Sequence, residues 1–376
     1  MIIQTLDIEQ QCTGVFSGGR LFFDNYDSII RKAEYAWKYS SALQHTDCKY
    51  LFPILKGRDL KDFSPDPEEY NSCKKLIEAH RQACVSAKVS LEEHCFFDVI
   101  PEYLLNKWLT IREHALIKAK DSLKEEDDFE ILRKAHILSK TVSDQNLMFK
   151  GKSQKVLYDI FGSVTGRMTT SRGSIPVLTL KKQDRADLLP SQDVFVELDF
   201  NAAEIRTLLA LSGQEQPKQD IHEWLIDGVF GRSTTREDAK KKLFSWLYNF
   251  SASESELSKI FSREIFRDFY CTNKQQIRTP FGRVIEVEER KAQNYLLQST
   301  TSDIVTEKAY NIMKILDNKK SKVAFTLHDS IILDFNREDI GLLRGLKGEF
   351  EATPWGDFRS TCKIGKTFGD LREIKV

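Results

Sequence analysis

The sequence lacks any long apolar run. None of its 376 residues lies in a stretch of about 18 consecutive apolar residues, which is the length that a membrane-spanning helix needs. The first residues also lack the basic and then apolar pattern of a secretion signal. We therefore expect no membrane association, no secretion and a cytoplasmic location.

Net charge and a cysteine framework are absent as well. Lys and Arg number 56 and Asp and Glu also number 56, so any nucleic-acid partner has to be held by a local concentration of basic side chains. The seven cysteines are an odd number and are scattered along the chain, which predicts small buried side chains rather than disulfides. With 41% hydrophobic and 30% charged residues, the composition is typical of a soluble globular protein with two or three packed units.

The first 150 residues give local signals for a hairpin and several helices. Residues 1–25 predict a β-hairpin that turns at Gly18 and Gly19. Residues 28–120 are predicted to be mainly helical, with Tyr35, Trp37, Tyr39 and Leu43 as early apolar positions. An acidic loop at residues 124–130 then separates this region from a helix at residues 129–140.

Residues 194–206, V-F-V-E-L-D-F-N-A-A-E-I-R, combine a strand pattern with a helix pattern. Apolar residues alternate up to Leu198, and a helical period begins at Ala203, so a strand is predicted to end at Asp199. A carboxylate fixed between two rigid elements suits metal-ion chemistry. In isolation, an aspartate at such a turn is also typical of a helix cap.

Residues 323–335, V-A-F-T-L-H-D-S-I-I-L-D-F, predict a second strand pair. The alternation breaks at His328 and Asp329, which places Asp329 at the tip of a β-hairpin. Two carboxylates at the ends of strands can share a pair of divalent cations about 3.5–4 Å apart. Because all the ligands would be oxygen atoms, magnesium is the expected metal.

A third stretch predicts a helix with a basic and aromatic face. Thr234 and Glu237 have the spacing of a capping box. The four residues that follow at intervals of four share one face over a rise of about 18 Å: Arg236, Lys240, Phe244 and Tyr248. The two basic side chains of such a face can bind a polyphosphate, and the two aromatic side chains can stack on a base. The alternative is a solvated basic helix with a buried aromatic edge.

Together these stretches resemble the three motifs of the family A DNA polymerases, the group that contains bacterial DNA polymerase I and many bacteriophage replicases. Residues 199–206 resemble the first motif, usually D-Y-S-Q-I-E-L-R, and residues 236–248 match the second, R-x-x-x-K-x-x-x-F-x-x-x-Y. L-H-D-S at 327–330 resembles the third, usually H-D-E. Shorter matches lie in register: T-G-R at 165–167 with I-P at 175–176, D-I-H at 220–222, R-K-A-Q-N-Y-L-L-Q at 290–298 and K-I-G-K-T-F-G-D-L at 363–371.

The resemblance implies an α+β fold of the right-hand polymerase type, with a palm built on an antiparallel sheet, helical fingers and thumb, and a small, mainly helical N-terminal region. The implied division is an N-terminal region at 1–90, a thumb at 91–154, palm at 155–215, fingers at 216–289 and palm again at 290–376. The match is dense over residues 155–376 and rests on position and helical pattern over 90–155.

The resemblance also implies a role for each matching residue. Asp199, Asp329 and the backbone carbonyl of Phe200 would hold two magnesium ions, with manganese as an expected substitute, and Lys240 would assist catalysis by donating a proton to pyrophosphate. The residues implied to bind the incoming dNTP are Glu204, His222, Arg236, Lys240, Phe244 and Tyr248. Those implied to contact primer-template DNA are Arg167, Arg290, Asn294, Gln298 and His328.

The implied function is DNA-directed DNA synthesis for replication or repair in a phage or other mobile element, in the cytoplasm of its bacterial host. We expect no intrinsic 3'–5' proofreading, because Asp7 and Glu9 offer the D-x-E spacing of an exonuclease without enough chain behind it. Accessory proteins or a proofreading subunit would act in trans. Ser330 departs from the third motif and matches the H-D-S of single-subunit phage RNA polymerases, so a transcriptase and a catalytically silent DNA-binding relative remain alternatives.

Overall fold

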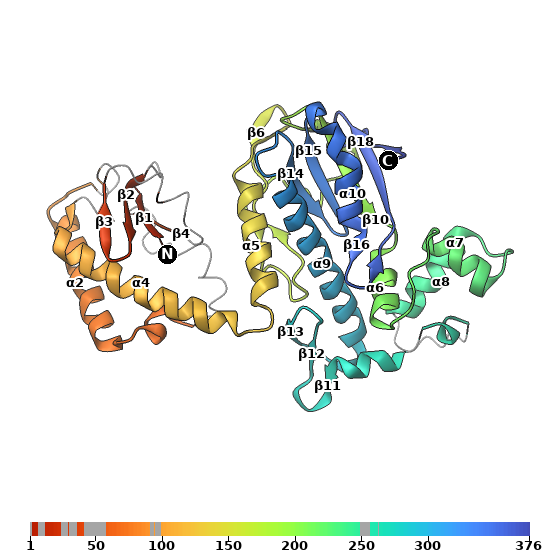
Figure 1. The fold of residues 1–376 in the computed structure, drawn as a ribbon, viewed down its shortest axis with the longest axis horizontal. Helices are drawn as coiled ribbons and strands as arrows, with labels where there is room; N and C mark the ends of the chain where they lie inside the picture. Colours follow the sequence, from red (N-terminus) through yellow and green to blue (C-terminus); the bar gives the residue numbers. More distant parts are fainter. Residues whose placement is uncertain are drawn as a thin grey trace. The chain divides into compact units, whose positions relative to one another are not determined.

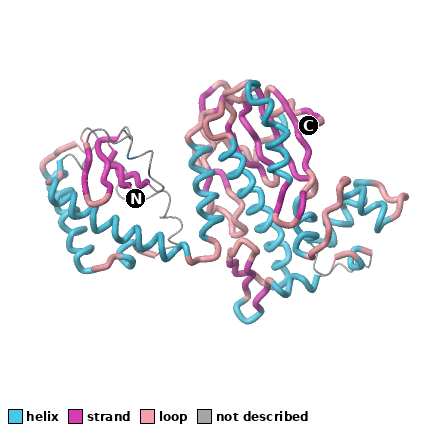
Figure 2. The backbone as a smooth tube through the Cα atoms, in the orientation of Figure 1, coloured by secondary structure: helices cyan, strands magenta, loops and turns pink. Residues whose placement is uncertain are grey.

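The chain folds into two compact units, Met1–Arg133 and Lys134–Val376 (Figure 1). The structure is a computed structural model that describes residues 2–6, 12–23, 36–40, 58–90, 99–248, 256–261 and 263–376, together with residues 29 and 94. Figure 2 shows that each unit combines strands with helices. The finer division into thumb, palm and fingers remains a prediction.

The first unit contains a four-stranded sheet and two long helices. The strands are β1 (Ile2–Leu6), β2 (Cys12–Ser17), β3 (Arg20–Phe22) and β4 (Ala36–Ser40), in the order β3-β2-β1-β4. A 3-10 helix (Leu60–Phe63), α2 (Pro67–Ser86) and α4 (Glu102–Lys124) follow. Phe16 of β2 and Trp108 of α4 belong to the same buried core.

Two sequence predictions for this unit need correction. The turn at Gly18 and Gly19 is confirmed, and both glycines have positive φ, but it joins β2 to β3, and β2 in turn pairs with β1. The predicted early helix is wrong at Trp37 and Tyr39, which lie in β4, parallel to β1. Aromatic residues two positions apart fit a strand as well as a helix, and pairing with β1 decides between them. Asp7 and Glu9 lie outside the described residues.

The second unit is built on an antiparallel five-stranded sheet, ordered β14-β15-β10-β18-β19. Its strands are β14 (Lys322–Leu327), β15 (Ser330–Phe335), β10 (Val194–Phe200), β18 (Ser360–Gly365) and β19 (Arg372–Ile374). The predicted strand at residues 194–199 and the predicted hairpin at 323–335 are therefore confirmed. The mixed helix and sheet content agrees with the expected α+β class.

Three helices pack near this sheet: α5 (Phe129–Ser143), α9 (Glu289–Ile315) and α10 (Leu343–Glu351). α9 and α10 lie side by side across the sheet (Figure 1). Phe200 at the end of β10 stacks on Phe350 of α10, with ring centroids 3.9 Å apart. This contact fixes the end of β10, where Asp199 lies.

A mainly helical segment interrupts the sheet between β10 and β14, as the sequence predicts. It contains α6 (Ala203–Leu211), α7 (Ile221–Leu225), a π-helix (Ile226–Phe230), α8 (Arg236–Tyr248) and 3-10 helices at Leu257–Lys259, Arg263–Asp268 and Thr272–Lys274. A small sheet of β11 (Tyr270–Cys271), β12 (Gln276–Arg278) and β13 (Val284–Glu286) precedes α9. The sequence predicts only its last strand. α6 to α8 share a separate core that includes Leu208, Leu225 and Trp246.

The remaining elements are short. They are β5 (Leu147–Phe149), β6 (Lys152–Gln154), β7 (Tyr158–Asp159), β8 (Thr169–Thr170), β9 (Leu188–Leu189), β16 (Ala352–Thr353), β17 (Gly356–Asp357) and 3-10 helices at Lys182–Asp187 and Arg337–Leu342. No helix in the described part of the chain is long and apolar enough to cross a membrane.

Candidate active site

Asp199 and Asp329 come from distant parts of the sequence. They meet at one end of the neighbouring strands β10 and β15. Asp199 pairs with Ser330 in the register of β10 with β15, and the backbone N–H of Phe200 donates to the carbonyl oxygen of Asp329 over 3.3 Å. Asp329 lies in the turn between β14 and β15, as predicted. The register therefore brings the two acidic residues together.

The turns beside both aspartates contain a left-handed residue that is not glycine. His328, just before Asp329, has a φ of +52°, and Ala202, at the start of α6, has a φ of +53°. This backbone conformation is costly for residues with a Cβ atom, and it persists where the surrounding structure holds it in place. Both turns are thus held in place by the surrounding fold.

The two carboxyl groups are crowded. Burial, followed by the charges of Asp329 and Glu197, raises the pKa of Asp199 from 3.8 to about 7. Burial also raises the pKa of Asp329. A divalent cation would neutralise this pair, and carboxylate and carbonyl oxygens are the ligands that magnesium prefers. Within the described residues no group of three or more His, Cys, Asp or Glu side chains could hold a metal ion, so a cation here depends on these two carboxylates and on main-chain oxygen atoms.

Replacing Asp199 with asparagine is expected to stabilise the metal-free protein at pH 8. Because the folded-state pKa lies above 3.8, the folded protein keeps a proton that the unfolded chain releases, and wild-type stability falls as pH rises from about 4 to about 7. The Asp199 side chain is 33% exposed, so solvent screening reduces the expected gain to about 1–2 kcal/mol. Chemical denaturation in EDTA at pH 4.5, 6 and 8 measures it. A difference that stays constant with pH would contradict the assigned cause.

α8 presents the predicted basic and aromatic face. The Nζ atom of Lys240 lies 5.7 Å from the centroid of the Phe244 ring, and the Phe244 and Tyr248 rings stack at 5.6 Å. The helix cap is shifted by one residue from the prediction. The Thr235 hydroxyl accepts from the backbone N–H of Asp238 and donates to the Asp238 carboxylate, whereas the Thr234 hydroxyl donates to the carbonyl oxygen of Phe230.

The C-terminal end of this face joins three other segments through Glu204. The Tyr248 hydroxyl donates to one oxygen of Glu204, and the Nη2 atom of Arg167 donates to the other over 2.7 Å. Gln298 of α9 lies close to the Tyr248 side chain. Glu204 and Arg167 also contribute to the electrostatic potential at Asp329. Four residues predicted for nucleotide or DNA binding therefore lie close to the aspartate pair.

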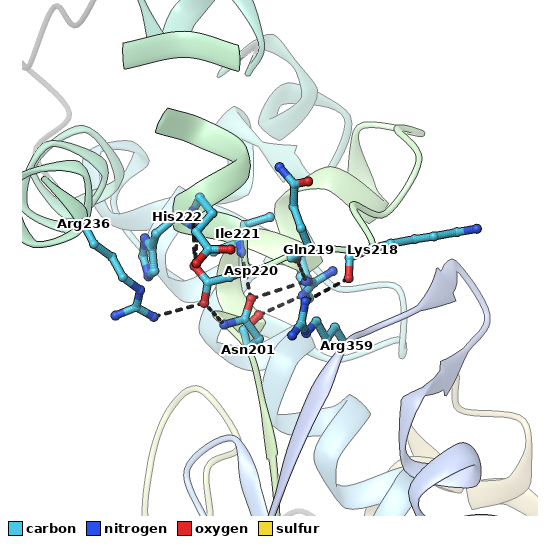
Figure 3. Close-up of polar contacts among 10 residues, drawn as sticks. Asn201, Lys218, Gln219, Asp220, Ile221, His222, Arg236 and Arg359 are labelled. Atoms are coloured by element: carbon cyan, nitrogen blue, oxygen red, sulfur yellow. Dashed lines mark hydrogen bonds and ion pairs between the residues drawn. The ribbon is translucent and has the colours of Figure 1, made fainter. Parts of the chain in front are cut away.

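The N-terminal end of the same face is tied to the residue that follows β10 (Figure 3). Asp220 accepts hydrogen bonds from Nδ2 of Asn201 at 2.7 Å and from Nη2 of Arg236 at 3.0 Å, and it caps α7 through the N–H groups of His222 and Glu223. Although burial acts to raise the pKa of Asp220, the hydrogen bonds from Arg236 and Asn201 hold it at about 2. Asp220 thus connects α8 to the end of β10.

Arg206 fixes the loop that carries Asp220. Its side chain is fully buried and donates to the carbonyl oxygens of Asn201, Pro217 and Gln219 over 2.8–3.1 Å. Sequence reasoning assigned no role to Arg206, Asn201 or Asp220. Their positions in the first motif and in D-I-H were the available signal.

His222 is 6% exposed, and its Nδ1 atom has no hydrogen-bond partner among the described residues. Burial lowers its pKa, so the imidazole is neutral at pH 7. The His222 imidazole therefore offers a neutral hydrogen-bond donor or acceptor. It lies near Arg236, whose positive charge also acts to lower the pKa of His222.

The remaining residues predicted to contact DNA are Arg290, Asn294 and His328. Arg290 is exposed and donates to Glu288 over 2.6 Å, and Asn294 is half-buried on α9, four residues before Gln298. His328 is exposed and lines a small cleft with Arg167.

Comparisons with known proteins find similar solved structures but no similar family model or curated sequence. The structure is similar to the POL domain of Pol1 from M. smegmatis in complex with DNA primer-template and dNTP. The TM-score is 0.48 and the identity 14%, and the similarity covers 85% of this chain and 67% of that chain.

Proposed function

We propose that the protein is a template-directed DNA polymerase that adds dNMP to a primer 3'-hydroxyl. The observation that carries this proposal is the meeting of Asp199 and Asp329 beside a helix face whose two ends are both tied to the chain that follows β10. The order and spacing of the polymerase-like motifs in the sequence support the same proposal.

Each charged group would have a defined task in phosphoryl transfer. Asp199, Asp329 and the Phe200 carbonyl would hold magnesium, which when bound supplies Lewis-acid stabilisation at the attacking and leaving oxygens. Arg236 and Lys240 bind the triphosphate, and the Lys240 ammonium donates a proton to the departing pyrophosphate. Arg236 exchanges Asp220 for a phosphate oxygen, and neutral His222 contributes a further hydrogen bond.

Glu204 would select the sugar. Its carboxylate is held from two sides by Arg167 and Tyr248, so its bulk is fixed beside the aspartate pair and would exclude a ribose 2'-hydroxyl. Phe244 and Tyr248 would pack on the nascent base pair. Arg167, His328 and the α9 residues Arg290, Asn294 and Gln298 would contact the minor groove at acceptor atoms shared by all base pairs.

Primer extension with dNTPs and with rNTPs tests this function. We expect magnesium-dependent extension with dNTPs and little with rNTPs. Glu204→Ala should raise relative rNTP use roughly tenfold to a hundredfold, because a few kcal/mol of steric exclusion is lost. Asp317→Asn is the control, since Asp317 is exposed just after α9 and makes none of the site contacts described above. Equal use of both substrates by the wild type would indicate a transcriptase, and no extension together with retained binding of primer-template DNA would indicate a silent DNA-binding protein.

A further inference from the structure

Glu197 and Lys363 form an ion pair directly beside Asp199. Glu197 lies two residues before Asp199 on β10, so both side chains leave the same face of the sheet. Lys363 is the cross-strand partner of Glu197 on β18. Its Nζ atom lies 2.6 Å from Oε2 of Glu197 and 3.8 Å from Oδ2 of Asp199. The Lys363 ammonium thus lies between Glu197 and Asp199 and is closer to Glu197.

The opposite neighbour of Asp199 offers no charge to this centre. Ser330, its partner on β15, is 2% exposed, and its hydroxyl donates to the carbonyl oxygen of Leu327 over 3.0 Å. A third carboxylate is therefore found not on β15 but on β10, as Glu197, which is 8% exposed and held by Lys363.

The pair acts on a metal ion through two opposing effects. The Lys363 ammonium repels a divalent cation bound at Asp199 and competes with it for the same oxygen. Glu197 offsets this effect, because it draws the ammonium towards itself and adds a negative charge to the partly buried site. Removal of Lys363 should therefore raise the affinity for the metal ion, and removal of Glu197 should lower it.

We propose that the Glu197–Lys363 pair sets how tightly the Asp199–Asp329 centre holds a divalent cation, with Lys363 lowering the affinity and Glu197 raising it. The proposal rests on the proposed function for the identity of the ion, magnesium or manganese. Both members are positioning residues, since they act through Asp199.

Manganese binding to the full chain, without DNA or nucleotide, tests the proposal. Electron paramagnetic resonance of free Mn²⁺ gives the Kd for each variant. We expect Lys363→Met to lower the Kd about tenfold, because Glu197 becomes a free carboxylate near Asp199. Glu197→Gln should raise the Kd about tenfold, because the ammonium is left with Asp199 as its neighbour. Lys363→Arg should stay close to the wild type, and the double variant E197Q/K363M should fall between the two single variants.

Lys347→Met is the matched control. Lys347 pairs with Glu351 over 2.6 Å, their side chains are 21% and 22% exposed, and both lie at α10, which stacks on the Phe200 side of the sheet. Its Kd should match that of the wild type. Circular dichroism of every variant identifies any that fails to fold. If Lys363→Met fails to fold, Glu197→Gln still decides the matter, because its Kd has to rise while that of Lys363→Arg stays close to the wild type.

The experiment separates two kinds of failure. If the wild type binds no Mn²⁺, or if Asp199→Ala binds it equally well, then the metal centre and the proposed function both fail. If Asp199→Ala abolishes binding but Lys363→Met and Glu197→Gln shift the Kd less than twofold, or in the same direction, the role of the pair is overturned and the proposed function stands.

Discussion

Asp329→Asn is expected to slow magnesium-dependent primer extension by a factor of roughly a thousand or more. Asp329 shares the candidate metal centre with Asp199, and an amide in its place removes one of the two negative charges that face each other at the end of β10. The loss of several kcal/mol of transition-state stabilisation gives this factor. Single-turnover extension at saturating dNTP and magnesium measures the chemical step.

Asp317→Asn provides the control for this measurement. Asp317 is exposed just after α9 and belongs to none of the site contacts described above. Its extension rate should remain within about twofold of the wild type, as expected for a surface substitution. If Asp329→Asn folds, binds primer-template DNA and keeps a tenth or more of the wild-type rate, then Asp329 does not hold the catalytic metal.

Asp303→Ala is expected to destabilise the second unit by about 3–5 kcal/mol. The Nε atom of Arg283 lies 2.9 Å from both carboxylate oxygens of Asp303, and the two side chains are only 10% and 0% exposed. Alanine would leave the guanidinium buried without its partner. Thermal unfolding should show a Tm lower by roughly 10 °C.

The same ion pair supports the T-G-R segment. A Cβ atom at Gly166 would lie 2.7 Å from Cζ of Arg283, and the Ser302 hydroxyl donates to the carbonyl oxygen of Gly166 over 3.3 Å. Arg167 follows Gly166 in the chain, so the loss of Asp303 should also weaken the contact that we propose between Arg167 and primer-template DNA. DNA affinity measured well below the new Tm separates this effect from unfolding.

Glu338→Ala is the matched control for stability. Glu338 pairs with Lys320 over 2.7 Å, but the two side chains are 69% and 57% exposed. Such surface pairs contribute little, so no measurable change in Tm is expected. Replacing both members of the buried pair by apolar residues, as in R283M/D303L, should restore much of the lost stability. Equal losses for Asp303→Ala and Glu338→Ala would contradict this account.

Local patterns predicted the elements that carry the aspartates. The alternation that ends near Asp199 and the break at His328 and Asp329 are properties of adjacent residues, so β10, α6 and the β14–β15 hairpin were predictable. The errors also have local causes. Two consecutive threonines before α8 made the capping residue ambiguous, and β11 and β12 are too short to show a period.

Contacts between segments could not be predicted in the same way. The pairing of Glu197 with Lys363 depends on the register of β10 with β18, and no local pattern determines that register. The link from Asn201 through Asp220 to Arg236 likewise depends on how α7 and α8 pack after β10. The motif resemblance placed these segments near one another but did not give their hydrogen bonds.

The most direct test of the central claim is to locate Mn²⁺ by anomalous diffraction in crystals of the protein with primer-template DNA and a dNTP. Our account predicts anomalous peaks within coordination distance of carboxylate oxygens of both Asp199 and Asp329, next to the triphosphate. Peaks that touch neither aspartate, or a triphosphate bound away from Arg236 and Lys240, would contradict it.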